Sequence, residues 1–88
     1  MQIEGAIVNE QGQTFAIVVI KSSTAAGGDG ALRQAAASFV PVFSGVPIIL
    51  MWQDSRGNPT YWGRPDIVNF LANIDMSRIP WQRYNLAA

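Results

Sequence analysis

The chain has 88 residues, of which 49% are hydrophobic and 14% are charged, and its formal net charge is zero. A chain of this length forms one domain. Its small fraction of charged residues is compatible with an exposed apolar patch of the kind that marks an interface. The sequence contains neither cysteine nor histidine. Disulfides, thiolate nucleophiles, metal sites with Cys or His ligands and Ser-His-Asp catalysis are therefore excluded.

The first residues lack the basic region and apolar stretch of a signal peptide. The longest apolar runs, residues 16–20 and 46–52, are far shorter than the roughly 20 residues that cross a bilayer. We therefore expect a cytoplasmic protein that has no contact with a membrane, and the lack of cysteine fits that compartment.

Two β-rich runs open the chain, at residues 2–9 and 14–21. The polar, glycine-containing segment 9–13 between them predicts a hairpin. The second run is apolar on both faces, which is typical of a strand in the interior of a sheet.

A small, flexible segment follows and leads into a helix over residues 31–39, whose apolar side chains recur at helical spacing. Asp29 is the predicted cap of this helix, and Pro41 is expected to end it. The glycine-rich stretch Gly27–Gly30 has two interpretations. It is a flexible connector, or it is an anion site at a helix start with Arg33 as the nearby cation.

The second half begins with the continuous apolar run 48–52, the predicted central strand. Residues 54–59 carry a strong turn signal, and residues 60–62 are expected to return as a short edge strand. An amphipathic helix is then predicted, because apolar side chains recur three and four residues apart. Its apolar positions are Ile67, Phe70, Leu71 and Ile74.

These elements predict an α+β fold in ββαββα order, with a mixed four-stranded sheet and two helices packed on one of its faces. Residues 1–88 are expected to form a single small domain. Residues 76–88 are expected to form a C-terminal tail that packs on the domain or on a partner, because they are rich in aromatic side chains.

Residues 46–74 resemble the C-terminal half of a thioredoxin-like domain. The resemblance rests on Gly45-Val46-Pro47 ahead of an apolar strand, a turn from Asp54 to Gly57, a return strand ending at Gly63, and the amphipathic last helix. It implies this order of local elements only. The thiol–disulfide chemistry of that family needs cysteine, which this chain lacks.

The six carboxylates offer no pair at a spacing that a helix or a strand would bring together. Asp54, Asp66 and Asp75 each have a structural role available, in a turn or at a helix end. We therefore expect no enzymatic activity and no cofactor or metal.

Basic and aromatic residues concentrate toward the C-terminus. Residues 1–54 carry two basic and four acidic side chains, whereas residues 55–88 carry four basic and two acidic side chains. Arginine and large aromatic residues are enriched at binding hot spots. The candidate binding residues are Tyr61, Trp62, Arg64, Arg56, Arg78, Trp81, Arg83 and Tyr84.

The function that this pattern favours is a non-catalytic interaction or oligomerisation module, which we expect to be a homodimer. In this hypothesis one sheet face stays apolar and, together with the Trp81–Tyr84 segment, is covered by a second copy or by another protein. The residues expected on that face are Ala16, Val18, Ile20 and Ile49. The alternative is weak binding of single-stranded nucleic acid or of an anionic ligand by the arginines, which the net charge of zero disfavours. In a third interpretation Trp52 and Trp62 belong to the core and Trp81 only anchors the tail.

Overall fold

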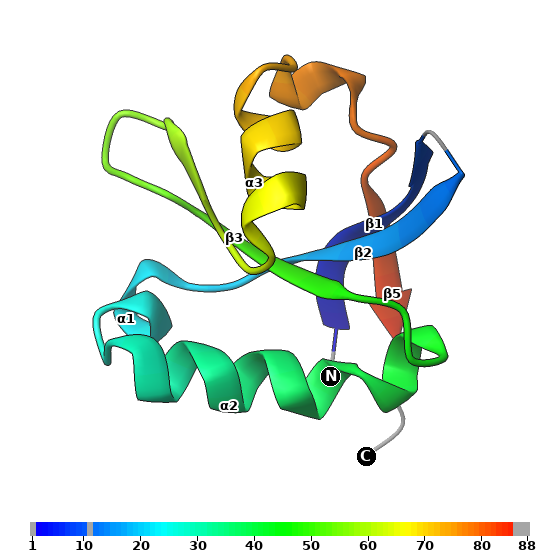
Figure 1. Ribbon diagram of the computed structural model, residues 1–88. Helices are drawn as coiled ribbons and strands as arrows, with labels where there is room; N and C mark the ends of the chain where they lie inside the picture. Colours follow the sequence, from blue (N-terminus) through cyan, green and yellow to red (C-terminus); the bar gives the residue numbers. More distant parts are fainter. Residues whose placement is uncertain (1, 11, 86–88) are drawn as a thin grey trace.

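The computed structural model describes residues 2–10 and 12–85. They form a small α+β domain built on a five-stranded mixed sheet in the order β4-β3-β2-β1-β5 (Figure 1). The strands are β1 (Gln2–Glu10), β2 (Gln13–Val19), β3 (Ile48–Gln53), β4 (Pro59–Trp62) and β5 (Gln82–Asn85). The helices are α1 (Ser22–Ala25), α2 (Asp29–Phe39) and α3 (Pro65–Ala72), with 3-10 turns η1 (Pro41–Phe43) and η2 (Met76–Arg78).

The N-terminal hairpin is confirmed, and β2 pairs in parallel with β3. Glu10 lies opposite Gln13, and the antiparallel ladder continues as far as the Gly5–Val18 pair. The connection from β2 to β3 carries α1 and α2, and it brings Ala16 beside Ile48 in a parallel ladder. Strand β2 therefore lies in the middle of the sheet, as its apolar character on both faces predicts.

The predicted four-stranded sheet is wrong by one strand. Part of the expected tail, Gln82–Asn85, pairs antiparallel with the start of β1 and forms the fifth strand. This strand has one aromatic residue among three polar ones and has no apolar run, so its pattern does not predict a strand. The last part of the expected tail, residues 86–88, lies outside the described residues.

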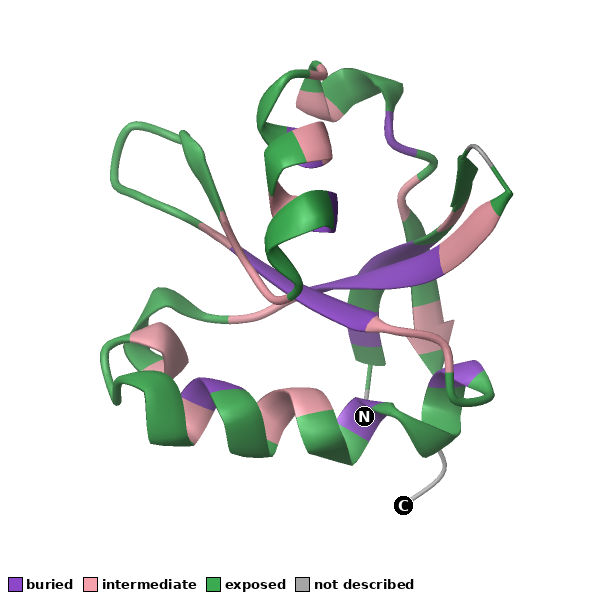
Figure 2. Ribbon diagram, viewed as in Figure 1, coloured by how far each residue is buried: buried purple, intermediate pink, exposed green. Residues whose placement is uncertain are grey.

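The expectation that both helices pack on one face is also wrong, because α2 and α3 lie on opposite sides of the sheet (Figure 1). Buried residues of the α2 face include Ala16, Val18, Leu32, Phe39 and Leu50. Buried residues of the α3 face include Ile17, Ile49, Met51, Ile67 and Leu71. Adjacent residues of β2 and β3 thus point into two cores, and the most buried part of the sheet lies between them (Figure 2).

Gly63 allows the chain to cross to the α3 face after β4. Its φ is +151°, and a Cβ atom built on it would lie 2.5 Å from Cδ1 of Ile49, a residue of the α3 face. Only glycine lets the backbone pass so close to β3 at this point. The helix that follows, α3, begins at Pro65, which suits the first turn of a helix.

The predicted cap of the first long helix is wrong, although its end is confirmed. Gly28, with φ +86°, occupies the N-cap of α2, and Asp29 is the first helical residue and makes no side-chain capping bond. Instead, the carboxylate of Asp29 accepts a hydrogen bond from Nε1 of Trp62 at 3.3 Å. The helix ends at Phe39, just before Pro41 opens the 3-10 turn η1.

Candidate interaction surfaces

Tyr61 and Trp62 are neighbours on the edge strand β4 and point to opposite faces of the sheet. Trp62 packs against the α2 core, whereas Tyr61 packs against the α3 core. The hydroxyl of Tyr61 is buried and has no hydrogen-bond partner among the described residues. Burial of this side chain raises the pKa of Tyr61 above its usual value. Both rings therefore serve mainly as packing for the two cores.

Arg64 is held beside the start of α3 by two neighbours. Its Nη2 lies 2.7 Å from Oδ2 of Asp66, and its Nε donates to Oδ1 of the same carboxylate at 3.2 Å. The side-chain amide of Gln13 is oriented so that its oxygen, and not its nitrogen, faces Arg64. This oxygen accepts a hydrogen bond from Nη1 of Arg64 at 2.7 Å. Arg64 thus links the start of β2 to the start of α3.

Arg56 lies at the exposed tip of the β3–β4 hairpin. The carboxylate of Asp54 organises this tip, because its Oδ1 accepts from the backbone N–H groups of Arg56 and Asn58, each at 2.9 Å. These bonds hold the pKa of Asp54 below its usual value, the bond from Asn58 being the main cause.

The C-terminal candidates divide between the two faces of the sheet. Trp81 packs on the α3 core and donates from Nε1 to the carbonyl of Met76 at 3.0 Å. Tyr84 packs on the α2 core, where its ring meets that of Phe43. Arg83 lies between them and pairs in register with Glu4 of β1. Arg78 belongs to the exposed turn η2.

The structure therefore separates the candidate residues into two groups. One group belongs to β4 and its two ends, and the other belongs to β5 and to the segment before it. Because β4 and β5 are the two edge strands, the width of the whole sheet lies between the groups (Figure 1). A single site cannot include both, and each edge is a separate candidate surface.

The outer edge of β5 has no partner strand among the described residues. The backbone N–H groups of Ala16 and Ile20 donate to carbonyl groups at β3. Because the backbone groups of successive residues in a strand point to opposite sides, those of the odd-numbered residues of β2 point to β1. By the same alternation Ile3 and Gly5 pair with Tyr84 and Gln82, and the backbone N–H groups of Arg83 and Asn85 point outward. We call this outward side of Gln82–Asn85 the β5 edge.

Two exposed aliphatic side chains belong to elements that contact β5, namely β1 and η1. Ile7 is 50% exposed and lies on β1 two residues beyond Gly5, where the pairing with β5 ends. Val42 is 40% exposed and belongs to η1, whose Phe43 packs on Tyr84 of β5. An open strand edge offers unpaired backbone groups to a second strand, and exposed apolar side chains nearby favour such an interface when they form a contiguous patch.

A cleft of about 850 Å³ lies where the start of β1, the end of β2 and α2 come together, and we call it the split-strand cleft. Its walls come from the start of β1, the end of β2 and the inner side of α2. Two hollows on the α3 side are much smaller, at about 180 and 170 Å³. The residues that line the cleft are Gln2, Ile3, Glu4, Val19, Ile20, Lys21, Thr24, Ala35, Ser38, Phe39 and Gln53.

Sequence reasoning missed the split-strand cleft, since none of the eight candidate residues lines it. The cleft is formed where β1 separates from β2, so it depends on the pairing of β1 with a strand eighty residues away along the chain. The nearest signal in the sequence is Gly5, at the point of separation. A Cβ atom there would lie 2.5 Å from the carbonyl oxygen of Ile17.

Three of the aspartates are engaged in local structure. Asp75 accepts from the backbone N–H and the hydroxyl of Ser77, each at 2.9 Å, and these bonds hold its pKa below the usual value. The hydrogen bonds from Arg64 lower the pKa of Asp66 in the same way. Together with Asp54, these side chains stay ionised at neutral pH and serve turns and helix starts.

Among residues 2–10 and 12–85, no cluster of three or more acidic side chains has a geometry that would hold a metal ion. Within the same residues, no helix has both the length and the apolar character needed to cross a membrane. Comparison of the chain with protein-family models, with curated proteins and with solved structures finds no match. The class that can be assigned is therefore structural, a small α+β domain with a five-stranded mixed sheet.

Proposed function

We propose that the protein is a non-catalytic interaction module that forms a homodimer through the β5 edge, and that it acts in the cytoplasm. The sheet face that the sequence suggested as the interface cannot serve, because α2 and α3 cover both faces. The proposal therefore moves the interface from the face of the sheet to its edge. The Trp81–Tyr84 segment keeps its proposed role, since it carries most of β5.

The observation that carries the proposal is a weakly protected strand edge near exposed aliphatic side chains. Strand edges in natural proteins are protected by proline, by charged side chains and above all lysine, by short length or by a covering segment, and β5 has only its short length and the single charge of Arg83. The opposite edge strand, β4, begins with Pro59, which removes one donor from its backbone. Strand β5 contains neither proline nor lysine, and Ile7 and Val42 belong to elements that contact it.

Antiparallel pairing of β5 with its copy about a two-fold axis joins the two sheets into one. With Tyr84 at the axis, Arg83 of one protomer lies opposite Asn85 of the other, and the two Arg83 side chains avoid each other.

The arginine-based alternative, binding of nucleic acid, receives less support from the geometry. Arg64 is tied to Asp66, whereas Arg56 and Arg83 belong to opposite edges of the sheet. Trp62 and Trp81 pack on different cores, so they offer no shared platform for stacking of bases. The acidic and basic side chains balance over the chain as a whole.

Size-exclusion chromatography with light scattering tests the proposal on three proteins at tens of micromolar. The wild type is expected to elute with the mass of a dimer. Arg83→Pro removes an outward backbone donor and leaves the bonds to β1 in place, so it is expected to be a folded monomer. Arg83→Ala is the matched control, because it removes the side chain but keeps the N–H group, and it is expected to remain a dimer. A monomeric wild type would contradict the proposal.

A further inference from the structure

Met76 lies where the turn η2 meets the end of β3. The side chain is half-buried against the α3 core, and its sulfur accepts a hydrogen bond of 3.8 Å from Nε2 of Gln53, the last residue of β3. The two residues are 23 positions apart in the chain, so this contact joins two separate elements. Because a thioether sulfur is a weak acceptor, the N–H group of Gln53 is only weakly satisfied here.

The side-chain nitrogen of Gln53 has a second partner, which fixes the orientation of the amide. Nε2 also donates to the carbonyl oxygen of Gly57 at 3.0 Å, within the β3–β4 hairpin. The amide oxygen of Gln53 in this place would face another oxygen, so the two N–H groups face Gly57 and Met76. Gln53 therefore presents an oriented donor to the sulfur of Met76.

The distance from the sulfur to this nitrogen is the one that a methionine sulfoxide needs. Oxidation adds an oxygen to the sulfur and makes the side chain polar. An S–O bond of about 1.5 Å, an O···N distance of about 2.9 Å and an angle of about 120° at the oxygen place sulfur and nitrogen about 3.9 Å apart. The observed distance of 3.8 Å fits this arrangement without movement of η2 or β3.

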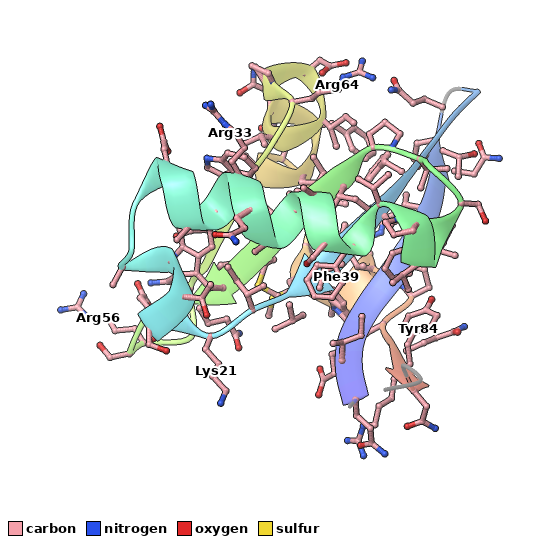
Figure 3. All side chains as sticks on the ribbon, turned by 90° about the horizontal axis from the view of Figure 1, so that it is seen from below. Lys21, Arg33, Phe39, Arg56, Arg64 and Tyr84 are labelled. Atoms are coloured by element: carbon pink, nitrogen blue, oxygen red, sulfur yellow. The ribbon has the colours of Figure 1, made fainter. Side chains whose placement is uncertain are left out.

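The contact lies at an open rim of the α3 core. Gln53 is exposed, and so is Arg56 at the nearby hairpin tip, whose side chain extends away from the ribbon (Figure 3). Met51, two residues before Gln53 on β3, is only 3% exposed. Because oxidation of a side chain requires access of the oxidant, Met76 is expected to react before Met51.

We propose that Met76 is a redox-sensitive site, which hydrogen peroxide oxidises to the sulfoxide, and that the Gln53 amide binds the new oxygen. In this step the O–O bond of the peroxide breaks, one oxygen forms a bond to the sulfur, and the other leaves as water. The sulfur loses two electrons, and the peroxide gains them. The new hydrogen bond ties η2 to the end of β3. Since the carbonyl of Met76 also accepts from Nε1 of Trp81, oxidation steadies the segment that leads into β5.

Peptide mapping after mild treatment of the folded protein with hydrogen peroxide tests the selectivity. Digestion with trypsin separates the three methionines, because the fragments 1–21, 34–56 and 57–78 carry one each. Met76 is expected to gain one oxygen about tenfold faster than Met51. Equal rates for Met51 and Met76, or no oxidation of Met76, would overturn the proposal.

A double-mutant cycle measures the coupling between the sulfoxide and Gln53. Urea denaturation is carried out on the reduced and the oxidised forms of the wild type and of Gln53→Leu. Oxidation is expected to affect the equilibrium constant of folding more favourably in the wild type than in Gln53→Leu, by about threefold or more. Met76→Leu, treated in the same way, is the control for oxidation at Met1. An equal effect of oxidation in the wild type and in Gln53→Leu would show that Gln53 does not bind the sulfoxide.

The side-chain NH₂ signals of Gln53 in ¹⁵N-labelled protein give a second readout that needs no variant of Gln53. Peroxide treatment of the wild type is expected to shift them, because one N–H group exchanges a sulfur acceptor for an oxygen. The same treatment of Met76→Leu is expected to leave them unchanged. If Gln53→Leu fails to fold, these signals decide, and unshifted signals in the oxidised wild type would refute the proposal.

Discussion

The ring of Tyr84 meets that of Phe43 edge to face, with their centroids 5.3 Å apart and their planes at 82°. This contact joins the last described strand of the sheet to the turn that follows α2, two elements that are far apart along the chain. Because β5 is short and pairs with β1 alone, the ring pair is a main anchor of the β5 edge.

Replacement of Tyr84 by leucine is expected to lower the free energy of unfolding by about 0.5–1.5 kcal/mol, the usual worth of such an aromatic pair. Urea denaturation followed by tryptophan fluorescence measures the change. Tyr84→Phe keeps the ring and is expected to stay close to the wild type. Equal losses for the two variants would show that the hydroxyl group, and not the ring contact, holds β5.

Gly5 is expected to be far less tolerant of a side chain than Gly30. A Cβ atom at Gly5 would lie 2.5 Å from the carbonyl oxygen of Ile17, so Gly5→Ala is expected to destabilise the protein by about 1–3 kcal/mol. Gly30 lies in the first turn of α2 with nothing within 4 Å of its added Cβ, so Gly30→Ala is expected to stabilise by about 0.4–1 kcal/mol. Thermal melts of both variants check the opposite signs, and a stable Gly5→Ala would contradict the close packing at the split of the sheet.

Stability is expected to fall in acid because the pKa values of Asp54, Asp66 and Asp75 are lowered from 3.8 in the folded state. In this case the unfolded chain binds protons first as the pH decreases. The contribution of these carboxylates to the free energy of unfolding is therefore complete above pH 3.8, and it is lost as the pH falls through their pKa values in the folded state. Urea denaturation near neutral pH and at about pH 3 measures the loss.

The Asp54→Asn variant isolates one of these groups. Asparagine keeps a turn-forming side chain but cannot ionise, so the difference in stability between the two pH values is expected to be smaller than in the wild type. Titration of the Asp54 carboxyl carbon by NMR is expected to give a midpoint below 3.8. An unchanged pH dependence in Asp54→Asn would contradict the role of its hydrogen bonds to Arg56 and Asn58.

The local elements of the fold are largely readable from the sequence. The polar break before Gln13 predicts the first hairpin, and the turn after Asp54 predicts the second, because each places turn-forming residues between apolar runs. The strand, turn, strand and helix predicted for residues 46–74 are all present, in that order. Pro41 and Pro65 mark a helix end and a helix start through their fixed φ.

The arrangement of these elements in space was harder to predict. The side on which α3 packs depends on how the chain turns at Gly63 against Ile49, a contact between distant residues. Strand β5 forms because β1 offers it a free edge, although Gln82–Asn85 has no strand pattern of its own. The candidate residues do not form one site for the same reason. Trp62 and Trp81 are close in the sequence, but Trp62 belongs to β4 and Trp81 directly precedes β5, and these strands are the opposite edges of the sheet.

The most direct test of the proposed homodimer is amide hydrogen exchange in β5 at increasing protein concentration. Gln82 and Tyr84 pair inward with β1 and are expected to be protected at every concentration. The amides of Arg83 and Asn85 point outward, so they are expected to gain protection only as the dimer forms. Fast exchange of Arg83 and Asn85 at all concentrations, with Gln82 and Tyr84 protected, would contradict pairing through the β5 edge.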